Sequence, residues 1–392
     1  MSKSEHTAPI INEIPPTRDY GTTVLGAARH RHCAPWDANA IALADELGKL
    51  ADVEVLGILD IDGRPMGILS REGLFALLGK PFGREVLGRT KAGELAEIVP
   101  LLNVHAGLFS AGAGKVRSGE SPYRLLVDVE GRFRAVLSSR DLAEHLSRIT
   151  QDDIELAGRI QERLEEGNEA VDGDGYRFEA WSRPAKGVGG DLWISRRLKG
   201  NSVFIALCDV SGKGVAASLV VSLVWGMLRM YDFSKGLYSL VVALNEALIT
   251  TFHLEKYLTC FMCVFDPVLK TIRVADMGHS LAFVLRGGTA HRLKSSKANL
   301  PIGVEPELRP FIHSWQLLPG DALFVYSDGL SEQENQSGVE FGEGRLAALA
   351  LRLHGRNDSL RETMPVAIDQ YRGRTPQQDD MSFMLLQLLG NS

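Results

Sequence analysis

The sequence is poor in cysteine and contains no long hydrophobic run. Its four cysteines in 392 residues are too few to suggest a disulfide framework, which favours a reducing compartment. The longest apolar stretch, residues 216–228, carries two serines and falls short of the roughly 20 residues that span a bilayer. It therefore predicts a buried helix. The N-terminus also lacks the apolar core of a signal peptide. We expect a cytoplasmic protein with no membrane partner.

The chain also lacks an excess of positive charge. Its formal net charge of -6 argues against nucleic acid as a partner, because a nucleic-acid-binding protein needs a basic face. The hydrophobic fraction of 45% is ordinary for globular proteins and allows sizeable cores. A prior of about 100–200 residues per domain predicts two or three domains.

Cys260 and Cys263 have the C-x-x-C spacing of zinc ligands. Their neighbours predict a strand, in which residues three positions apart point to opposite faces. The sequence offers no second C-x-x-C or histidine pair to complete a tetrahedral site. We interpret both as buried core thiols, the usual fate of a free cysteine.

The N-terminal third contains an internal repeat. Residues 59–70, LDIDGRPMGILS, recur at 127–138 as VDVEGRFRAVLS. Each copy places an acidic-glycine turn between two apolar runs and then begins a helix, which predicts a hairpin that leads into a helix. The two copies resemble a CBS-domain pair, and the resemblance implies an α/β domain over residues 21–146. Residues 1–20 are polar and contain prolines, and we expect a flexible arm there.

CBS pairs often bind adenine nucleotides through a Ser/Thr-x-x-Asp motif, whose aspartate holds the ribose. The second copy has Ser138 and Asp141 at these positions, whereas the first has Gly73 in place of the carboxylate. The resemblance therefore implies at most one nucleotide site, with Ser138 and Asp141 as its residues. The alternative is that Ser138 only caps the following helix, because serine is a preferred N-cap.

Apolar residues follow three- and four-residue steps from Leu142 to Leu164, interrupted at Asp153. This pattern predicts a helical linker over residues 147–168. It is consistent with a short coiled coil, in which one polar seam position fixes the register. We expect a homodimer through the 142–166 helix; the alternative is a helix that packs on its own C-terminal domain.

The composition changes after Gly167 to short strands and glycine turns, which predicts a layered α+β domain over residues 169–392. Apolar runs predict strands at 203–208, 259–265, 271–275, 281–285, 322–326 and 382–388, and helical patterns fill 215–231, 239–253, 343–354 and 359–371.

Acidic residues lie where these strands end or begin. Asp191 follows two glycines, Asp209 and Asp328 end apolar runs before glycine loops, and Asp379 with Asp380 begins the last strand. Two carboxylates about 4 Å apart repel by roughly 4 kcal/mol at an effective dielectric near 20, so a cluster must bind protons or cations. Oxygen ligands suit Mg²⁺ or Mn²⁺, and two such ions would clamp a phosphate and generate hydroxide.

The order of the motifs over residues 152–389 is similar to that of the SpoIIE/RsbU branch of the PPM metal-dependent Ser/Thr phosphatases. The matching segments are Ile154–Gln161, Gly189–Asp191, Cys208–Gly214, Gly278–His279, Leu300–Gly303, Pro319–Asp321, Tyr326–Gly329, Phe341–Gly342 and Gln378–Ser382.

The resemblance implies a site with two Mn²⁺ or Mg²⁺ ions. Asp209 would bridge both ions, and the Val210 carbonyl would belong to the same shell. Asp191 would serve one ion, and Asp328 with Asp379 the other. Asp209 and Asp328 are therefore the expected catalytic residues. The implied fold is an α-β-β-α sandwich of two antiparallel sheets between two helical layers.

Some positions leave the assignment open. Asp380, beside Asp379, is either an alternative ligand or a residue that orients the site. The wider superfamily often has a histidine where this chain has Ser211, so the proton donor is unassigned. We interpret His279 as a structural hydrogen-bonding residue. Lys213 either attracts phosphate or is a solvated loop lysine.

These observations predict a metal-dependent phosphatase of phosphoserine or phosphothreonine in a partner protein. By resemblance the substrate is a STAS-type anti-sigma-factor antagonist in a bacterial partner-switching pathway, and the N-terminal domain regulates activity. The alternatives are a catalytically silent phosphoprotein-binding protein and a nucleotide-sensing regulatory protein.

Overall fold

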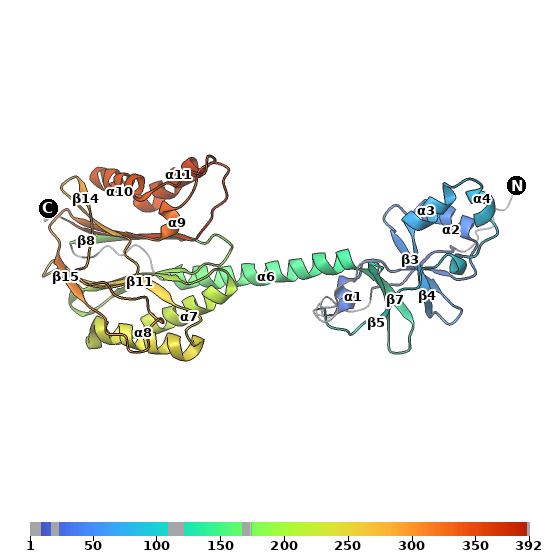
Figure 1. Ribbon diagram of the computed structural model, residues 1–392, viewed down its shortest axis with the longest axis horizontal. Helices are drawn as coiled ribbons and strands as arrows, with labels where there is room; N and C mark the ends of the chain where they lie inside the picture. Colours follow the sequence, from blue (N-terminus) through green and yellow to red (C-terminus); the bar gives the residue numbers. More distant parts are fainter. Residues whose placement is uncertain (1–8, 17–22, 109–120, 167–172, 174, 390–392) are drawn as a thin grey trace. The chain divides into compact units, whose positions relative to one another are not determined.

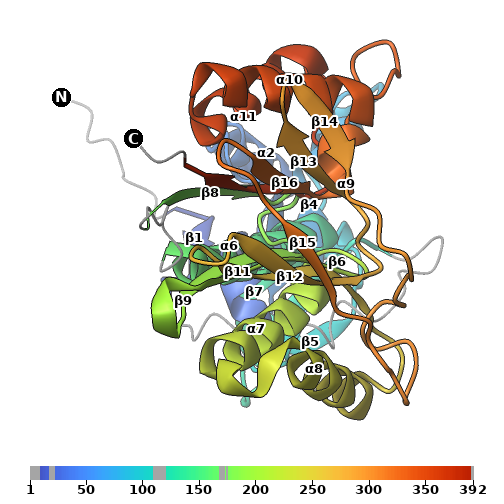
Figure 2. The same ribbon diagram turned by 90° about the vertical axis from the view of Figure 1, so that its left-hand side faces the viewer.

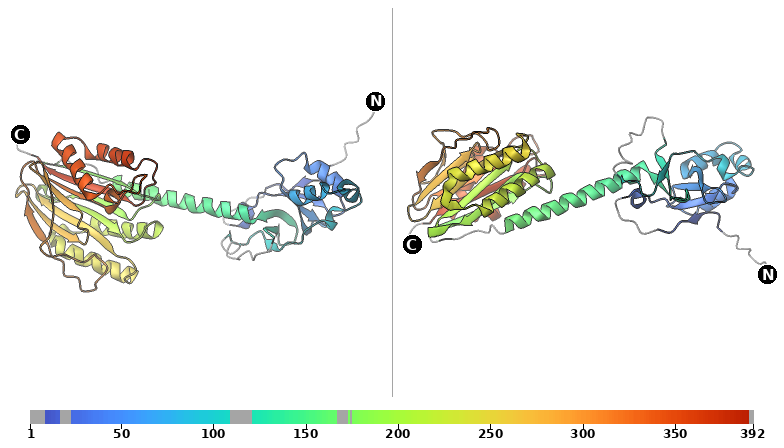
Figure 3. Two further views of the ribbon diagram at one scale, coloured as in Figure 1. Left: turned by 45° about the horizontal axis from the view of Figure 1, so that its top comes forward. Right: turned by 90° about the horizontal axis from the view of Figure 1, so that it is seen from below.

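The computed structural model forms two compact units, residues 1–151 and 152–392 (Figure 1). Helix α6 (Ser139–Glu166) contains the boundary between them, so the division falls inside one continuous helix (Figure 3). Residues 147–166 of the predicted linker are thus the second part of a helix that begins at the end of the second repeat, and residues 167–168 lie outside the described residues. The described residues are 9–16, 23–108, 121–166, 173 and 175–389.

The N-terminal unit contains two small sheets that share one arrangement. In each, a parallel strand pair is followed by an antiparallel hairpin that leads into a helix. Both hairpins turn at an aspartate, Asp60 or Asp128, whose Oδ1 accepts hydrogen bonds from two following backbone N–H groups. This confirms the hairpin repeat, and the resemblance to a CBS pair stays a prediction. The elements are β1 (Asn12–Glu13), α1 (Val24–Ala27), β2 (His32–Pro35), α2 (Ala40–Leu47), β3 (Val55–Leu59), β4 (Pro65–Ser70), α3 (Arg71–Leu78), α4 (Gly83–Leu87), β5 (Leu101–Asn103), β6 (Tyr123–Val127) and β7 (Phe133–Ser138).

The expectation of a flexible arm over residues 1–20 is wrong for residues 9–16. β1 pairs with β2 through Asn12 and Glu13, and Ile11 is buried. The backbone N–H groups of Ile10 and Ile11 donate to the Glu46 carboxylate at 3.0 Å each. The segment is fixed because one buried isoleucine and one carboxylate on α2 hold it. Residues 1–8 and 17–20 lie outside the described residues.

The C-terminal unit is a sandwich of two five-stranded antiparallel sheets, ordered β15-β12-β11-β10-β9 and β14-β13-β16-β17-β8. Figure 2 shows α7 and α8 below the first sheet and α10 and α11 above the second. The elements are β8 (Tyr176–Arg183), β9 (Asp191–Arg197), β10 (Val203–Val210), α7 (Val215–Met230), α8 (Gly236–Phe252), β11 (Leu258–Asp266), β12 (Thr271–Met277), β13 (Ala282–Arg286), β14 (Thr289–Arg292), β15 (His313–Gln316), β16 (Ala322–Tyr326), α9 (Asp328–Ser331), α10 (Glu343–Arg356), α11 (Leu360–Arg372) and β17 (Met381–Leu388).

The six strands and four helices predicted for this unit are present. The apolar strands alternate between two cores, because successive residues of a strand face opposite sides. On β10, Phe204 packs under α7 and α8, whereas Ile205 faces the other sheet. Cys260 and Cys263 likewise lie in opposite cores and are fully buried, which confirms their interpretation as core thiols.

Among the described residues, no single helix is long and apolar enough to span a membrane. Helix α7 together with the following segment through α8 passes that test only as a pair bent by 83°. The apolar faces of both helices are buried against the first sheet, which explains their composition.

Candidate active site

Sheet pairing brings the predicted aspartates together at one end of the sandwich. On the first sheet, Asp209 near the end of β10 pairs directly with Asp191 at the start of β9. On the second, Asp328 follows β16, while Asp379 and Asp380 precede β17, the neighbouring strand. The two sheets meet here, since the Gly190 N–H donates to the Asp380 carboxylate at 2.6 Å.

Asp191 is the most deeply buried of the five aspartates. Its side chain is 5% exposed, and its Oδ2 has no hydrogen-bond partner among the described residues. Burial, and then the charge of Asp209, raises the pKa of Asp191 well above its usual range. A buried carboxylate oxygen without a donor fits a position that a cation completes.

The other carboxylates share this excess of negative charge. Burial first, and then repulsion from Asp328 and Asp379, raises the pKa of Asp209 to about 7. Burial and Asp379 likewise raise the pKa of Asp328. Each carboxylate therefore makes ionisation of its neighbours less favourable, which a bound divalent cation would reverse.

Asp379 and Asp380 have different environments although they are adjacent. Asp380 is buried and accepts hydrogen bonds from the backbone N–H groups of Ala185 at 2.7 Å and Gly190 at 2.6 Å. The Asp379 carboxylate is 34% exposed and forms an ion pair with Lys213 at 2.7 Å. Asp380 thus holds the loop before Asp191, and Asp379 is the freer carboxylate.

The side chains of this cluster have the chemistry that hard divalent cations require. All of the candidate ligand atoms in side chains are carboxylate oxygens, the ligands that Mg²⁺ and Mn²⁺ prefer. Val210 lies beside them: its N–H donates to the Gly190 carbonyl at 3.1 Å. Among the described residues, however, no three His, Cys, Asp or Glu side chains already form a metal-binding group. In this arrangement the Asp379 carboxylate is paired with Lys213.

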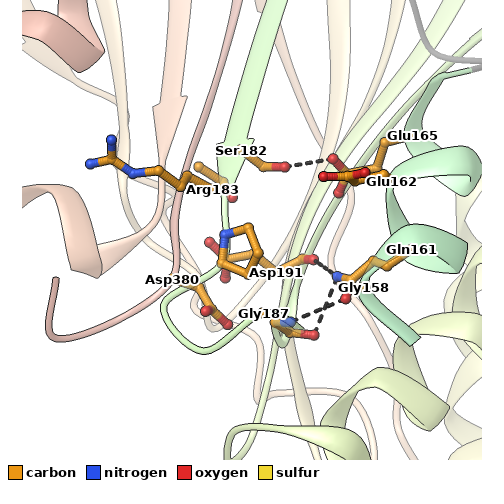
Figure 4. Close-up of a pocket in the computed structure, with 12 residues that line it drawn as sticks. Gly158, Gln161, Glu162, Glu165, Ser182, Arg183, Gly187, Asp191 and Asp380 are labelled. Carbon is orange, nitrogen blue, oxygen red and sulfur yellow. Dashed lines mark hydrogen bonds between the residues drawn. The ribbon is translucent and has the colours of Figure 1, made fainter. Parts of the chain in front are cut away.

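Gln161 on α6 was not among the predicted site residues, although it ends the first matching segment. Its side chain accepts a hydrogen bond from the Gly189 N–H at 3.1 Å and donates to the carbonyls of Gly189 and Asp191 at 3.3 Å each (Figure 4). It thereby fixes the backbone that presents Asp191. The isolated glutamine gives no sign of this, because its partners lie on a distant loop.

A cavity of about 180 Å³ lies between α6 and this loop. Glu165 of α6 points toward it and accepts a hydrogen bond from the Ser182 hydroxyl at 2.5 Å (Figure 4). Burial raises the pKa of Glu165 to about 7, although the Ser182 hydrogen bond acts in the opposite direction. The C-terminal part of α6 therefore packs on its own domain.

One face of α6 thus packs on the C-terminal domain, as expected under the alternative to a coiled coil. The indole N–H of Trp225 on α7 also donates to the Leu164 carbonyl at 3.0 Å. Leu156 and Ile160, however, are half exposed, at 50% and 51%. Two seam residues of the predicted coiled coil are thus still accessible, and the homodimer stays a prediction.

His279 and Ser211 have structural partners. The ring Nε2 of buried His279 bonds to the Tyr326 carbonyl at 2.9 Å, close to Asp328 in sequence. The Ser211 hydroxyl accepts a hydrogen bond from the Tyr257 N–H at 3.0 Å. His279 matches its interpretation as a structural residue, and Ser211 helps to hold the loop after Asp209.

Ser138 and Asp141 adopt the arrangement of a helix cap. The Asp141 N–H donates to the Ser138 hydroxyl at 3.0 Å, and that hydroxyl donates to the Asp141 carboxylate at 2.7 Å. Asp141 is also 3.2 Å from the His30 ring and only 5% exposed. The structure favours the capping alternative, because partners within the domain already satisfy the carboxylate expected to hold a ribose.

The sandwich and its strand-end aspartates define a PP2C-type (PPM) fold for the C-terminal unit. This fold matches the SiaA-PP2C domain of Pseudomonas aeruginosa with a TM-score of 0.51 and 20% identity, covering 62% of this chain and 97% of that one. Residues 199–389 match the family described as Stage II sporulation protein E (SpoIIE). The predicted α-β-β-α sandwich is confirmed.

Two curated relatives are similar to a part of the chain. Protein IcfG of Synechocystis is 26% identical over 200 residues, which are 44% of this chain and 31% of that protein. Phosphoserine phosphatase RsbU of Bacillus subtilis is 25% identical over 189 residues, 47% of this chain and 55% of that protein. The chain thus matches only about a third to a half of each relative's length. Together the comparisons show a PP2C-type fold in the C-terminal unit and a similarity to the SpoIIE family over residues 199–389.

Proposed function

We propose that the C-terminal unit hydrolyses phosphoserine or phosphothreonine in a partner protein with the help of two Mn²⁺ or Mg²⁺ ions. The observation that carries this proposal is the convergence of aspartates from both sheets, with raised pKa values at Asp191, Asp209 and Asp328. The similarity to a phosphoserine phosphatase supports the same chemistry.

In this proposal Asp209 and Asp191 hold ions from the first sheet, and Asp328 and Asp379 from the second. Val210 contributes its carbonyl. When bound, the ions supply a nucleophilic hydroxide and neutralise charge on the phosphate. The protein orients the ligands: Asp380 and Gln161 fix the Gly189–Asp191 backbone. Phosphate-monoester hydrolysis is among the slowest uncatalysed reactions, so both contributions are needed.

The substrate we propose is a phosphorylated STAS-type anti-sigma-factor antagonist of a bacterial partner-switching pathway. The support is the motif order shared with the SpoIIE/RsbU branch and the match over residues 199–389. A panel of phosphorylated proteins tests this directly: release of phosphate from a phospho-STAS protein, and not from an unrelated phosphoserine protein, is the expected result.

We further propose that the N-terminal unit regulates the site through α6 and that α6 mediates a homodimer. The support is that α6 runs from one unit into the other and that Gln161 on it bonds to the backbone at Asp191. Deletion of residues 1–140 should change both phosphatase activity and oligomeric state, measured with thermal unfolding as a control for folding. Unchanged values of both would contradict this proposal.

The decisive experiment is p-nitrophenyl phosphate turnover with Mn²⁺, with EDTA, and in the Asp209→Asn and Asp328→Asn variants. We expect Mn²⁺-dependent turnover that EDTA and either substitution abolish. Asp266→Asn is a matched control, because Asp266 serves only a turn at the far end of β11. Activity that survives both active-site substitutions would overturn the site assignment. Phosphoprotein binding without turnover under any metal would favour the silent phosphoprotein-binding protein.

A further inference from the structure

Lys213 places a positive charge on one of the proposed metal ligands. Its ammonium group lies 2.7 Å from the Asp379 carboxylate and donates to the Gln378 carbonyl at 3.1 Å. Lys213 belongs to the loop after β10 on the first sheet, whereas Asp379 precedes β17 on the second. The ion pair therefore connects the two sheets directly across the carboxylate cluster.

The loop that carries Lys213 is held in place. The flanking glycines, Gly212 and Gly214, both have positive φ, 88° and 78°, a region that other residues rarely adopt. Ser211 fixes the start of the loop, since its N–H donates to the Tyr257 carbonyl at 2.9 Å and its carbonyl accepts from the Lys256 ammonium at 2.9 Å. The loop thus presents the Lys213 side chain toward the second sheet.

We propose that Lys213 is an internal counter-ion of the carboxylate cluster, which competes with a divalent cation for Asp379. This inference rests on the proposed function, because it takes Asp379 as a metal ligand. A carboxylate oxygen bonded to an ammonium group has less electron density to offer a metal. The two cations also repel one another, so each disfavours binding of the other.

The solvent exposure of the Lys213 and Asp379 side chains determines how strongly Lys213 competes with a metal ion. The Lys213 and Asp379 side chains are 41% and 34% exposed, and ion pairs of this kind are weak. A divalent ion can therefore displace Lys213, at a moderate loss of affinity. Removal of the ammonium group should tighten metal binding about three- to fivefold.

The test is Mn²⁺ titration by calorimetry on the full-length wild type, Lys213→Met and Lys213→Arg. Lys213→Arg is the matched control, because it keeps the positive charge. We expect a Kd about three- to fivefold lower for Lys213→Met, and a value within about twofold of wild type for Lys213→Arg.

The outcomes separate the two proposals. Mn²⁺ binding by the wild type with an equal or higher Kd for Lys213→Met overturns the counter-ion role and leaves the proposed function intact. An equal decrease in Kd for Lys213→Arg also overturns it, because loss of the positive charge would then not be the cause. Absence of Mn²⁺ binding by all three proteins overturns the proposed function, and the counter-ion role with it.

Discussion

Asp191 and Asp209 lie directly opposite each other on the antiparallel strands β9 and β10. Opposed residues of such a pair have Cβ atoms about 4.5–5.5 Å apart and project from the same face of the sheet. Like charges at this position destabilise the pair. Accordingly, the charge of Asp209 contributes, after burial, to the raised pKa of Asp191. The sheet register therefore produces the concentration of negative charge on which cation binding depends.

The different environments of Asp379 and Asp380 predict different effects of the same substitution. Asp379→Asn should abolish Mn²⁺-dependent turnover with little effect on folding, because the Asp379 carboxylate is partly exposed. Asp380→Asn should also lower the free energy of unfolding, by about 1–3 kcal/mol, since it disturbs hydrogen bonds to the half-buried Ala185 and the buried Gly190 backbone N–H groups. Turnover assays and chemical denaturation of both variants measure this. Equal losses of stability would contradict the assignment of Asp379 as the ligand.

Gln161 predicts a local change in backbone dynamics. Gln161→Leu removes three hydrogen bonds to the Gly189–Asp191 backbone, so amide exchange in this segment should accelerate roughly tenfold or more. Hydrogen–deuterium exchange measured by mass spectrometry reports it. Glu162→Gln is the control: Glu162 lines the same cavity, and no described hydrogen bond joins it to this segment. Equal protection in wild type and Gln161→Leu would show that α6 does not hold the loop.

Glu165 predicts a dependence of stability on pH. Its pKa rises from 4.5 in the unfolded chain to about 7 in the fold, so the native state binds the proton more tightly. This contribution is fully present below pH 4.5 and is lost as pH rises through 7. Glu165→Gln should therefore exceed wild type in stability at pH 8, by up to about 3 kcal/mol, with a smaller difference at pH 5. Thermal melts across this range test it, and a difference that does not grow with pH would refute it.

Asp209 predicts a dependence of metal affinity on pH. Because its pKa is about 7 in the absence of metal, cation binding below pH 7 must release a proton. The apparent Kd for Mn²⁺ should fall as pH rises from 6 to 7, by up to about tenfold per proton released, and level off above 8. Calorimetry in buffers of different ionisation enthalpy counts these protons. A Kd that is constant from pH 6 to 8 is the contrary result.

Most of the C-terminal fold could be predicted because its central strands are continuous apolar runs. β10, buried on both faces between the α7–α8 layer and the second sheet, is the clearest example. All four edge strands, β8, β9, β14 and β15, escaped prediction. β14 and β15 are short and polar, with five of their eight residues exposed.

The sequence predicts those residues of the candidate site that belong to local motifs. All five aspartates stand beside glycines or strand ends, and the structure gathers them. Gln161 and Glu165 depend instead on tertiary contacts between α6 and segments more than a dozen residues away. The same holds for the Ile11–Glu46 contact, which orders a segment whose composition alone indicated a loose arm.

Gly158 on α6 faces the carbonyl oxygen of Gly187, and a Cβ atom at position 158 would overlap that oxygen. The spacing between helix and loop is therefore set by the absence of a side chain. A single methyl group at this position would act as a wedge and separate the helix from the backbone that leads to Asp191. Gly158→Ala, the smallest possible increase in side-chain volume, would thus disturb the backbone that leads to the proposed metal site.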